Sequence, residues 1–293
     1  MAYLTGPVNT LTDYTVEYNG LLIGGTSPYE IPPVWNFLDM AALKTMDQAR
    51  VWNDGSWSGP DFADVLLPEM PIEISASSAV TFTAAVTALR SIFVPQTVAQ
   101  PLWVKLPGMP AMGIPAKVNK RIIPIDMGWQ GGFASAVVQW RCPDPVWQSV
   151  PRSYTLAAPS STNSGLQFPL FVPAVGAYAS PGSLDFGSTV VAASSAQLTN
   201  SGNTNAWPVV TVAGPCPSFT ITMDGNNVTY GQALQAGQAV TVDYKTGLAT
   251  LTGNVDRTYA LTSRQFSPVT SLSTLFFSAS AGTAIVTIAD VSR

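Results

Sequence analysis

The sequence predicts a mainly β protein of two domains, with one α-helix packed in the first domain. Three observations support this class. Residues 208–252 divide into short segments in which apolar and polar side chains alternate, the period of strands with one buried face. The chain has 293 residues, long enough for two separate cores. Its composition also changes near residue 150.

The second half of the chain carries the clearest strand pattern. Val240, Val242 and Tyr244 share one face of a segment whose other face holds Thr241 and Asp243. Asp224-Gly225 suits a type I′ hairpin turn, because both central residues of that turn need positive φ. Lys245-Thr246-Gly247 marks the next turn. We expect strands over 208–213, 219–223, 227–230, 239–244 and 248–252.

The domain boundary is expected near Ser149. Seven of the eight Trp lie at or before Trp147, and the first 152 residues hold 12 acids and 9 bases, against 5 and 4 in the remaining 141. Pro143, Pro145 and Pro151 punctuate the junction, as is typical of a chain leaving one domain for another. These features predict domains over 1–149 and 150–293.

The helix of the first domain is expected over 77–92. Ser77 or Ser78 can act as its N-cap, and Val94-Pro95 ends it. Its buried face follows the helical period, with Phe82, Val86, Leu89 and Phe93.

Most of the remaining first domain reads as strands. They are expected over 15–23, 71–75, 101–106, 116–125 and 133–141, with Gly24-Gly25 after the first and a turn at Pro107-Gly108. Ala136, Val138 and Trp140 form one face of the last. Residues 39–54 fit either a helix with Met40, Leu43 and Met46 on one face or two short extended segments.

Composition excludes several classes of catalytic and metal site. The chain has no histidine, which rules out Ser-His-Asp and Cys-His catalysis and zinc sites that need imidazole. Cys142 and Cys216 are 74 positions apart, so they are read as two buried thiols or as a single bridge between domains. Gly24-Gly25 and Gly131-Gly132 are turns, since no phosphate-binding loop follows them. We expect no cofactor and no metal.

Charge bears on the partners. A net charge of −4, a pI near 4.7 and the lack of any Lys/Arg run argue against a nucleic-acid binder. Charged residues make up 10% of the chain, against roughly 25% in ordinary globular proteins. Either much of the surface is covered by copies or partners, or Ser, Thr, Asn and Gln keep it soluble. Residues 1–14 lack the pattern of a secretory signal, and the long uncharged runs are too rich in Pro and Gly to insert into a membrane.

A series of short motifs runs in a fixed order along almost the whole chain. In the first half these are a Gly-containing element over 21–25, WNxL over 35–38, DGSWSGPDF over 54–62, PIEIS over 71–75, the helix, PLWVKLPG over 101–108 and VVQWRCPDP over 137–145. In the second half they are TNSGNTNAWP over 199–208, VxGP over 212–215 and AGQxVxVD over 236–243. Each motif is weak alone, but the collinear series resembles that of siphophage distal tail proteins.

The resemblance implies a structural protein of a phage virion and not an enzyme. Residues 1–149 would be a β-sandwich with a helix that builds a hexameric ring, and 150–293 a galectin-like β-sandwich that projects outward. The ring would join the tail tube to the tip or baseplate complex. The implied partners are further copies of the chain, the tail tube protein, the tape-measure protein and the tail tip hub protein. Assembly would take place in the host cytoplasm, and the protein would then reside at the tail tip of the virion.

The clustered Trp and the channel of such a ring add two expectations. Trp is a favoured anchor of protein interfaces, although core packing accounts for at least half of these Trp in our interpretation. DNA passing through the lumen must not bind it, so the channel wall of 1–149 is expected to be neutral to acidic. Lys117, Lys120 and Arg121 would then be paired or turned away from it.

Three other functions compete with this interpretation. A glycoside hydrolase can work with paired carboxylates, and Asp61, Asp64, Glu69 and Glu73 lie within thirteen positions. Surface carboxylates are the simpler reading. A carbohydrate-binding module or host-surface adhesin would stack sugars on exposed aromatic rings, for which the second half offers Trp207, Tyr178, Tyr230, Tyr244 and Tyr259. A tube subunit is disfavoured by the two-domain length.

Overall fold

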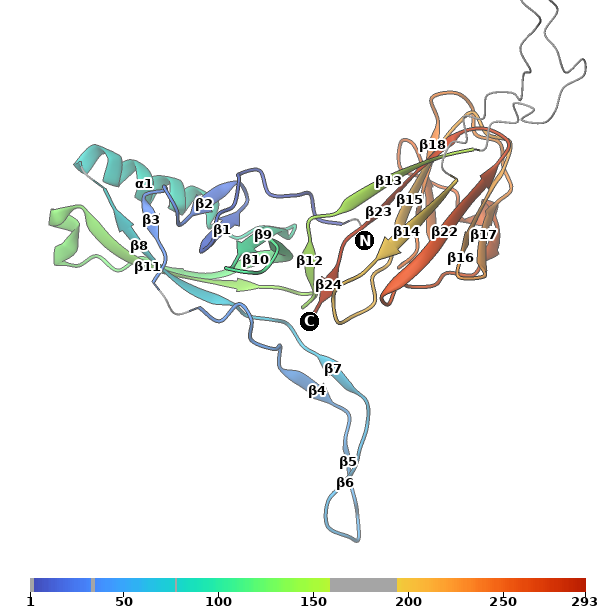
Figure 1. The fold of residues 1–293 in the computed structure, drawn as a ribbon. Helices are drawn as coiled ribbons and strands as arrows, with labels where there is room; N and C mark the ends of the chain where they lie inside the picture. Colours follow the sequence, from blue (N-terminus) through green and yellow to red (C-terminus); the bar gives the residue numbers. More distant parts are fainter. Residues whose placement is uncertain (1–2, 33–34, 77, 159–193) are drawn as a thin grey trace, which may run out of the picture. The chain divides into compact units, whose positions relative to one another are not determined.

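The computed structural model describes residues 3–32, 35–76, 78–158 and 194–293, which form two compact units (Figure 1). The first unit contains Tyr3–Pro151, Ser201–Thr204 and Ala289–Arg293. The described part of the second contains residues 152–158, 194–200 and 205–288. The main division thus falls after Pro151, close to the expected Ser149. The domain bounds 1–149 and 150–293 stay a prediction; in this division two short segments of the second half, Ser201–Thr204 and Ala289–Arg293, group with the first unit.

A nine-stranded antiparallel sheet organises the first unit. Its central path runs β2-β1-β9-β10-β11-β8-β3, and β12 pairs with both β10 and β24. β10 pairs with β9 as far as Ala116 and with β11 from Lys117 onward, so it joins two halves of the sheet. The strands are β1 Thr15–Tyr18, β2 Leu21–Ile23, β3 Tyr29–Glu30, β8 Glu69–Ser75, β9 Gln100–Lys105, β10 Met112–Ile122, β11 Phe133–Arg141, β12 Trp147–Ser149 and β24 Val291–Ser292.

Residues 15–23 form a hairpin and not the single strand expected from their alternation. β1 and β2 pair with each other, Tyr18 opposite Leu21. Between them Asn19 and Gly20 have φ of 48° and 82°. Asn-Gly is the preferred pair for a type I′ turn, because both residues tolerate positive φ. The turn was therefore readable in the sequence, and the alternation on either side concealed it.

Residues 42–64 form a separate hairpin, which we call the arm. β4 Leu43–Thr45 pairs with β7 Asp61–Ala63, and β5 Gln48–Ala49 pairs with β6 Ser56–Trp57. Of the two interpretations of 39–54, the extended one is correct and the helix is wrong. Met40, Leu43 and Met46, which would have shared a helix face, are 73%, 48% and 59% exposed. No core lies beneath them, so pairing with 56–63 decides the conformation.

The expected helix is confirmed as α1 Ala79–Ile92, the one α-helix in the part of the chain that the structure describes. Ser78 is its N-cap: the Ser78 hydroxyl accepts from the Thr81 N–H, and the Thr81 hydroxyl accepts from the Ser78 N–H. Phe82, Val86 and Leu89 are buried, as their spacing predicts. A short 3₁₀ helix, η1 Met127–Gly131, lies in the loop between β10 and β11.

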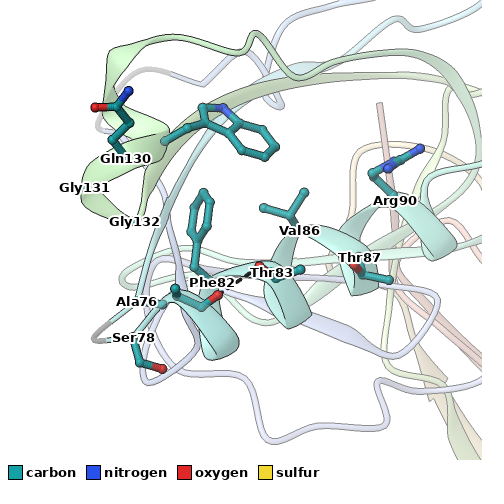
Figure 2. Close-up of a pocket in the computed structure, with 12 residues that line it drawn as sticks. Ala76, Ser78, Phe82, Thr83, Val86, Thr87, Arg90, Gln130, Gly131 and Gly132 are labelled. Carbon is teal, nitrogen blue, oxygen red and sulfur yellow. Dashed lines mark hydrogen bonds between the residues drawn. The ribbon is translucent and has the colours of Figure 1, made fainter.

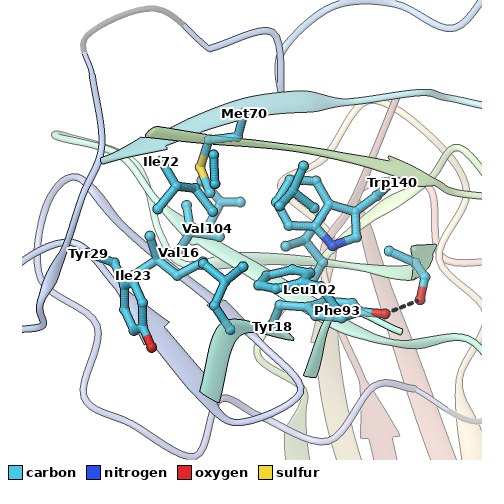
Figure 3. Packing of buried hydrophobic residues seen from close by; sticks show 14 of the residues in the cluster. Val16, Tyr18, Ile23, Tyr29, Met70, Ile72, Phe93, Leu102, Val104 and Trp140 are labelled. Carbon is cyan, nitrogen blue, oxygen red and sulfur yellow. Dashed lines mark hydrogen bonds between the residues drawn. The ribbon is translucent and has the colours of Figure 1, made fainter. Parts of the chain in front are cut away.

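Aromatic rings fill the centre of this unit (Figure 3). Trp140 of β11 is fully buried, and its ring centroid lies 5.8 Å from each of those of Tyr18, Phe37 and Phe93. Tyr18 stacks on Phe93 at 5.3 Å, and its hydroxyl donates to Gln96 Oε1 at 3.0 Å. The rings thus connect β1 and β11 with the C-terminal end of α1. The predicted face of Ala136, Val138 and Trp140 is confirmed, since all three are buried.

The second unit consists of two antiparallel sheets. The six-stranded sheet has the order β13-β23-β15-β18-β19-β20, and the five-stranded sheet β14-β22-β16-β17-β21. Their strands are β13 Arg152–Ala157, β14 Ser195–Thr199, β15 Val209–Ala213, β16 Phe219–Met223, β17 Asn226–Tyr230, β18 Ala239–Asp243, β19 Leu248–Leu251, β20 Val255–Asp256, β21 Leu261–Arg264, β22 Leu272–Ala279 and β23 Thr283–Ile288. A 3₁₀ helix, η2 Thr258–Ala260, precedes β21.

The five strands expected in 208–252 are confirmed, and no strand end differs from its expected position by more than one residue. Asp224 and Gly225 have φ of 50° and 84°, as the predicted type I′ turn requires. The sequence interpretation assigned no strand beyond residue 252, where β20 to β24 lie. The mainly β class is correct for both units, whereas the galectin-like form of the second stays a prediction.

A clasp formed by Ser201–Thr204 and Ala289–Arg293 completes the first unit. β24 pairs with β12, Trp147 opposite Ser292. The Asn203 amide donates to the Arg293 carbonyl at 3.0 Å and accepts from the Arg293 N–H at 2.8 Å. The Thr204 N–H donates to the Val291 carbonyl at 3.2 Å. Gly202 lies so close to Val291 that an added Cβ would stand 1.8 Å from the Val291 oxygen.

We predict that Gly202→Ala destabilises the first unit by about 1–3 kcal/mol, because the new methyl group must push β24 away from its partner. Urea unfolding followed by Trp fluorescence is a suitable measurement, since seven of the eight Trp lie at or before Trp147. Gly131→Ala is the matched control, because a Cβ there meets nothing within 4 Å. Equal midpoints for the two variants would contradict the proposed role of the clasp.

We also predict that the first unit loses stability in alkali. Burial raises the pKa of Tyr18 from 10.0 to about 12, and burial raises the pKa of Cys142 from 9.0 to about 12. Both groups therefore lose their protons more readily in the unfolded chain. The stability is fully present below about pH 9 and falls as the pH rises toward 12.

Tyr18→Phe removes one of these groups and should make the fall in urea midpoint between about pH 8 and pH 11 shallower. Tyr14→Phe, which alters a 62% exposed ring, serves as the control. An identical slope for Tyr18→Phe and the wild type would show that Tyr18 does not contribute.

Candidate interaction surfaces

The arm carries several large apolar side chains that are exposed to solvent. Trp52 is 92% exposed, Val51 82% and Trp57 65%. Leu43, Met46 and Phe62 are also exposed along the same hairpin. Isolated apolar side chains on a surface are normal, but a group of this size on one short hairpin is typical of an interaction site.

The arm is also acidic. Within 42–64, four Asp face two bases, Lys44 and Arg50. Lys44 pairs with Asp64 at 2.8 Å, and a hydrogen bond from Lys44 is the main cause that lowers the pKa of that carboxyl. The Arg50 guanidinium lies 4.6 Å from the centre of the Trp57 ring. Asp54 follows Trp52 by two residues in the turn of the hairpin, so the end of the arm carries both an exposed ring and an acidic residue.

A second surface lies along α1, and we call it the helix groove. One wall is the outward face of the helix with Ala79, Thr83 and Thr87, and the other is formed by Trp129–Gly132 of the η1 loop. In Figure 2, Phe82 and Val86 point from the helix into this hollow, and Arg90 lies near its end. The hollow measures about 410 Å³, and the Phe82 and Trp129 rings meet edge to face at 5.4 Å.

The groove continues past both sides of this hollow. A shallow depression of about 780 Å³ shares Ala79, Thr83 and Thr87 with it and adds Val80, Ala84 and Ala88. Another of about 310 Å³ shares Val86, Arg90 and Trp129 and adds Arg121. The outward face of α1 is therefore small and uncharged, whereas exposed helix faces are normally charged. Arg90 is the one charged residue of this helix.

Basic residues gather near the C-terminal end of α1. Arg121 donates to the Arg90 and Phe93 carbonyls at 2.7 and 2.8 Å, which satisfies free acceptors of the helix end. Lys117 donates to the Thr97 carbonyl at 2.5 Å, and Lys120 is exposed. None of these three cations takes part in the ion pairs among the described residues of the first unit, which join Lys44 to Asp64 and Lys105 to Asp13.

The carboxylates considered for glycoside hydrolysis do not form a recessed pair. Asp61 and Glu69 are exposed on β7 and β8, and Asp64 is bound to Lys44. Glu69 accepts from Gln139 Nε2 at 3.1 Å, and Glu73 stands opposite Glu30 on β3. None of the four lines the hollows described above.

The aromatic side chains considered for sugar binding are mostly inaccessible. Tyr230 and Tyr244 are 1% and 2% exposed, and Trp207 is half-buried. Tyr178 lies outside the described residues. Tyr259 is 63% exposed, and its hydroxyl is bonded to Arg257. One open ring among these candidates does not make the platform that stacking a sugar requires.

Cys142 and Cys216 are both buried and free, and burial raises the pKa of each thiol. The described part of the chain contains no group of three His, Cys, Asp or Glu placed to hold a metal ion. Nor does any helix within it have the length and apolar character needed to cross a membrane.

Comparison with known proteins gives likeness of structure alone. No family model and no curated protein matches the sequence. The crystal structure of the Dit protein of phage SPP1, described as a paradigm of the hub adsorption apparatus in phages infecting Gram-positive bacteria, has a TM-score of 0.61 at 10% identity. The match covers 96% of this chain and 99% of that one.

Chains of the phage P2 baseplate in its activated conformation, with Ca and with Sr, have TM-scores of 0.51 and 0.50 at 8% identity. Each match covers 94% of this chain and 97% of the other. At such identities the likeness is one of fold. The structural neighbours of this chain are thus hub and baseplate proteins of phage tails, which is the relationship that the order of its sequence motifs predicted.

Proposed function

We propose that this chain is a structural component of a phage tail, in which six copies form a ring between the tail tube and the tip or baseplate complex. The observation that carries the proposal is the shared fold with the SPP1 Dit protein over 96% of the chain. The collinear motifs support the same assignment independently of the coordinates. The protein would be assembled in the host cytoplasm and reside at the tail tip.

The surface of the first unit supports self-assembly. A ring needs a heterologous interface, in which two different patches of one chain meet in neighbouring copies. The arm and the helix groove are two such patches: the arm is protruding, apolar and acidic, and the groove is lined by small side chains with Arg90 and Arg121 near one end. The tail tube protein, the tape-measure protein and the tip hub protein are the proposed further partners, without specific binding of nucleic acid or insertion into a membrane.

The channel wall is proposed to be neutral to acidic, so that DNA passes without binding. Lys117 and Arg121 support this, because both are bound to backbone carbonyls and Arg121 is held at the end of α1. Lys120 is exposed, so its position relative to the channel tests the proposal most directly. A ring in which these cations lined the channel unpaired would contradict this part of the proposal.

We predict that the purified full chain forms a particle of six copies of 30.9 kDa, about 185 kDa. Light scattering after size exclusion gives the mass, and electron micrographs should show rings with a central channel. The full chain is required, because a fragment of 1–149 lacks β24 and the clasp. A chain that stays monomeric at high concentration would contradict the ring.

We also propose that the chain is not an enzyme. It has no histidine, and its candidate carboxylates are exposed, bonded to Lys44 or Gln139, or set on separate strands. We predict no fragments when the protein is incubated with cell-wall polysaccharide and the products are analysed by mass spectrometry. Release of fragments that Asp61→Asn or Glu69→Gln abolished would overturn this expectation.

A further inference from the structure

We propose that the arm of one copy docks into the helix groove of a neighbouring copy, with Trp52 at the centre of the contact. This inference rests on the proposed ring and names the contact that closes it. The two surfaces belong to the same unit, and neither is covered by other described residues of that unit. Four features of these surfaces lead to a second copy as the occupant.

The arm lacks a core of its own. Its strands form two separate two-stranded sheets, and within the described residues they pair with each other and not with the nine-stranded sheet. Isolated two-stranded hairpins are marginally stable in water. Trp52 and Val51 are almost fully solvated, and burying a Trp removes roughly 150–250 Å² from water. A partner would therefore both order the arm and bury its most apolar side chains.

The groove has the shape and lining that an apolar hairpin end needs. Ala84 and Thr87 on the outward face of α1 are small, so a second backbone can approach closely. Trp129 gives the adjoining hollow an aromatic wall, and Phe82 and Val86, each 5% exposed, add apolar surface to its lining. An indole entering there can pack edge to face on a ring, as Phe82 and Trp129 already do with each other.

The charges of the two surfaces are complementary. The arm holds four Asp against two bases, and Asp54 follows Trp52 by two residues in the turn at its end. The charged side chains that line the groove are Arg90 and Arg121, and no acid lines it among the described residues. Such an arrangement favours approach of the arm in one orientation. It equally disfavours contact between two arms or between two grooves.

The two surfaces also differ from each other, which sets the symmetry. When the arm of one copy fills the groove of a second copy, the groove of the first copy and the arm of the second copy both stay free. Contacts of this head-to-tail kind continue until the last copy meets the first and the ring closes. Trp anchors of this sort commonly dominate the binding energy of an interface.

The experiment uses two variants of the full chain, one for each surface. Trp52→Ser removes the anchor, and Ala84→Glu places a bulky negative charge in the groove. We expect each variant alone to be monomeric where the wild type forms rings, with the apparent affinity between copies lowered about tenfold or more. Mass is measured by light scattering, and circular dichroism verifies folding.

Matched controls change similar side chains elsewhere. Thr81→Glu places the same charge on an exposed position of α1 that does not line the groove, and Glu at this position suits the capping box. Val8→Ser removes an 83% exposed apolar side chain outside the arm. Both controls should form rings like the wild type.

Mixing the two variants gives the decisive result. Trp52→Ser retains an intact groove, and Ala84→Glu retains an intact arm, so one good contact is available per pair. An equimolar mixture should form 1:1 pairs and no ring, which a misfolded variant could not do. If the wild type forms rings and either variant also does, or if the mixture stays monomeric, arm docking is wrong while the ring remains. A monomeric wild type would overturn both proposals.

Discussion

The packing of Trp140 against Tyr18, Phe37 and Phe93 is the interaction on which the first unit depends. These rings hold β1, β11 and the end of α1 to one centre. The indole N–H of Trp140 is buried without a hydrogen-bond partner, at a cost of about 1–3 kcal/mol that burial of the large rings offsets. Because α1 packs into the unit through its buried face, Phe82, Ala85, Val86 and Leu89, its opposite face is not needed for folding and is available for contact with another molecule.

The parts of the fold that the sequence predicted are those set by local patterns. α1, β11 and β16 follow from the period of their apolar residues and from Ser78 or Asp224-Gly225 at their ends. The arm was ambiguous because its conformation depends on pairing between segments on either side of Gly55, and β24 was missed because its partner β12 is more than 140 residues away. Exposure could be predicted only where a strand pattern was clear: Trp140 alternates with Ala136 and Val138 and is fully buried, whereas no face could be assigned around Trp52, which is 92% exposed.

The low charge of the chain has a different origin in each unit. In the second unit, hydroxyl side chains replace charges on the strands, and cross-strand pairs such as Thr211 with Thr241 and Thr220 with Thr229 bond to each other at 3.0 and 3.2 Å. In the first unit, the outward face of α1 is made of small uncharged side chains, and the arm exposes large apolar side chains beside its charges. The polar-surface interpretation therefore fits the strands of the second unit, and the exposed apolar side chains of the first unit are what the covered-surface interpretation expects.

The clasp ties the folding of the first unit to the order of synthesis. Ribosomes make β12 early, but its partner β24 emerges only after every strand of the second unit has left the exit tunnel. A nascent chain therefore carries an unfinished sheet edge at β12 until residues 289–293 arrive. A chain that ends within the second unit would lack β24 and keep the β12 edge unpaired. Translation that stops early therefore yields a subunit with an exposed sheet edge.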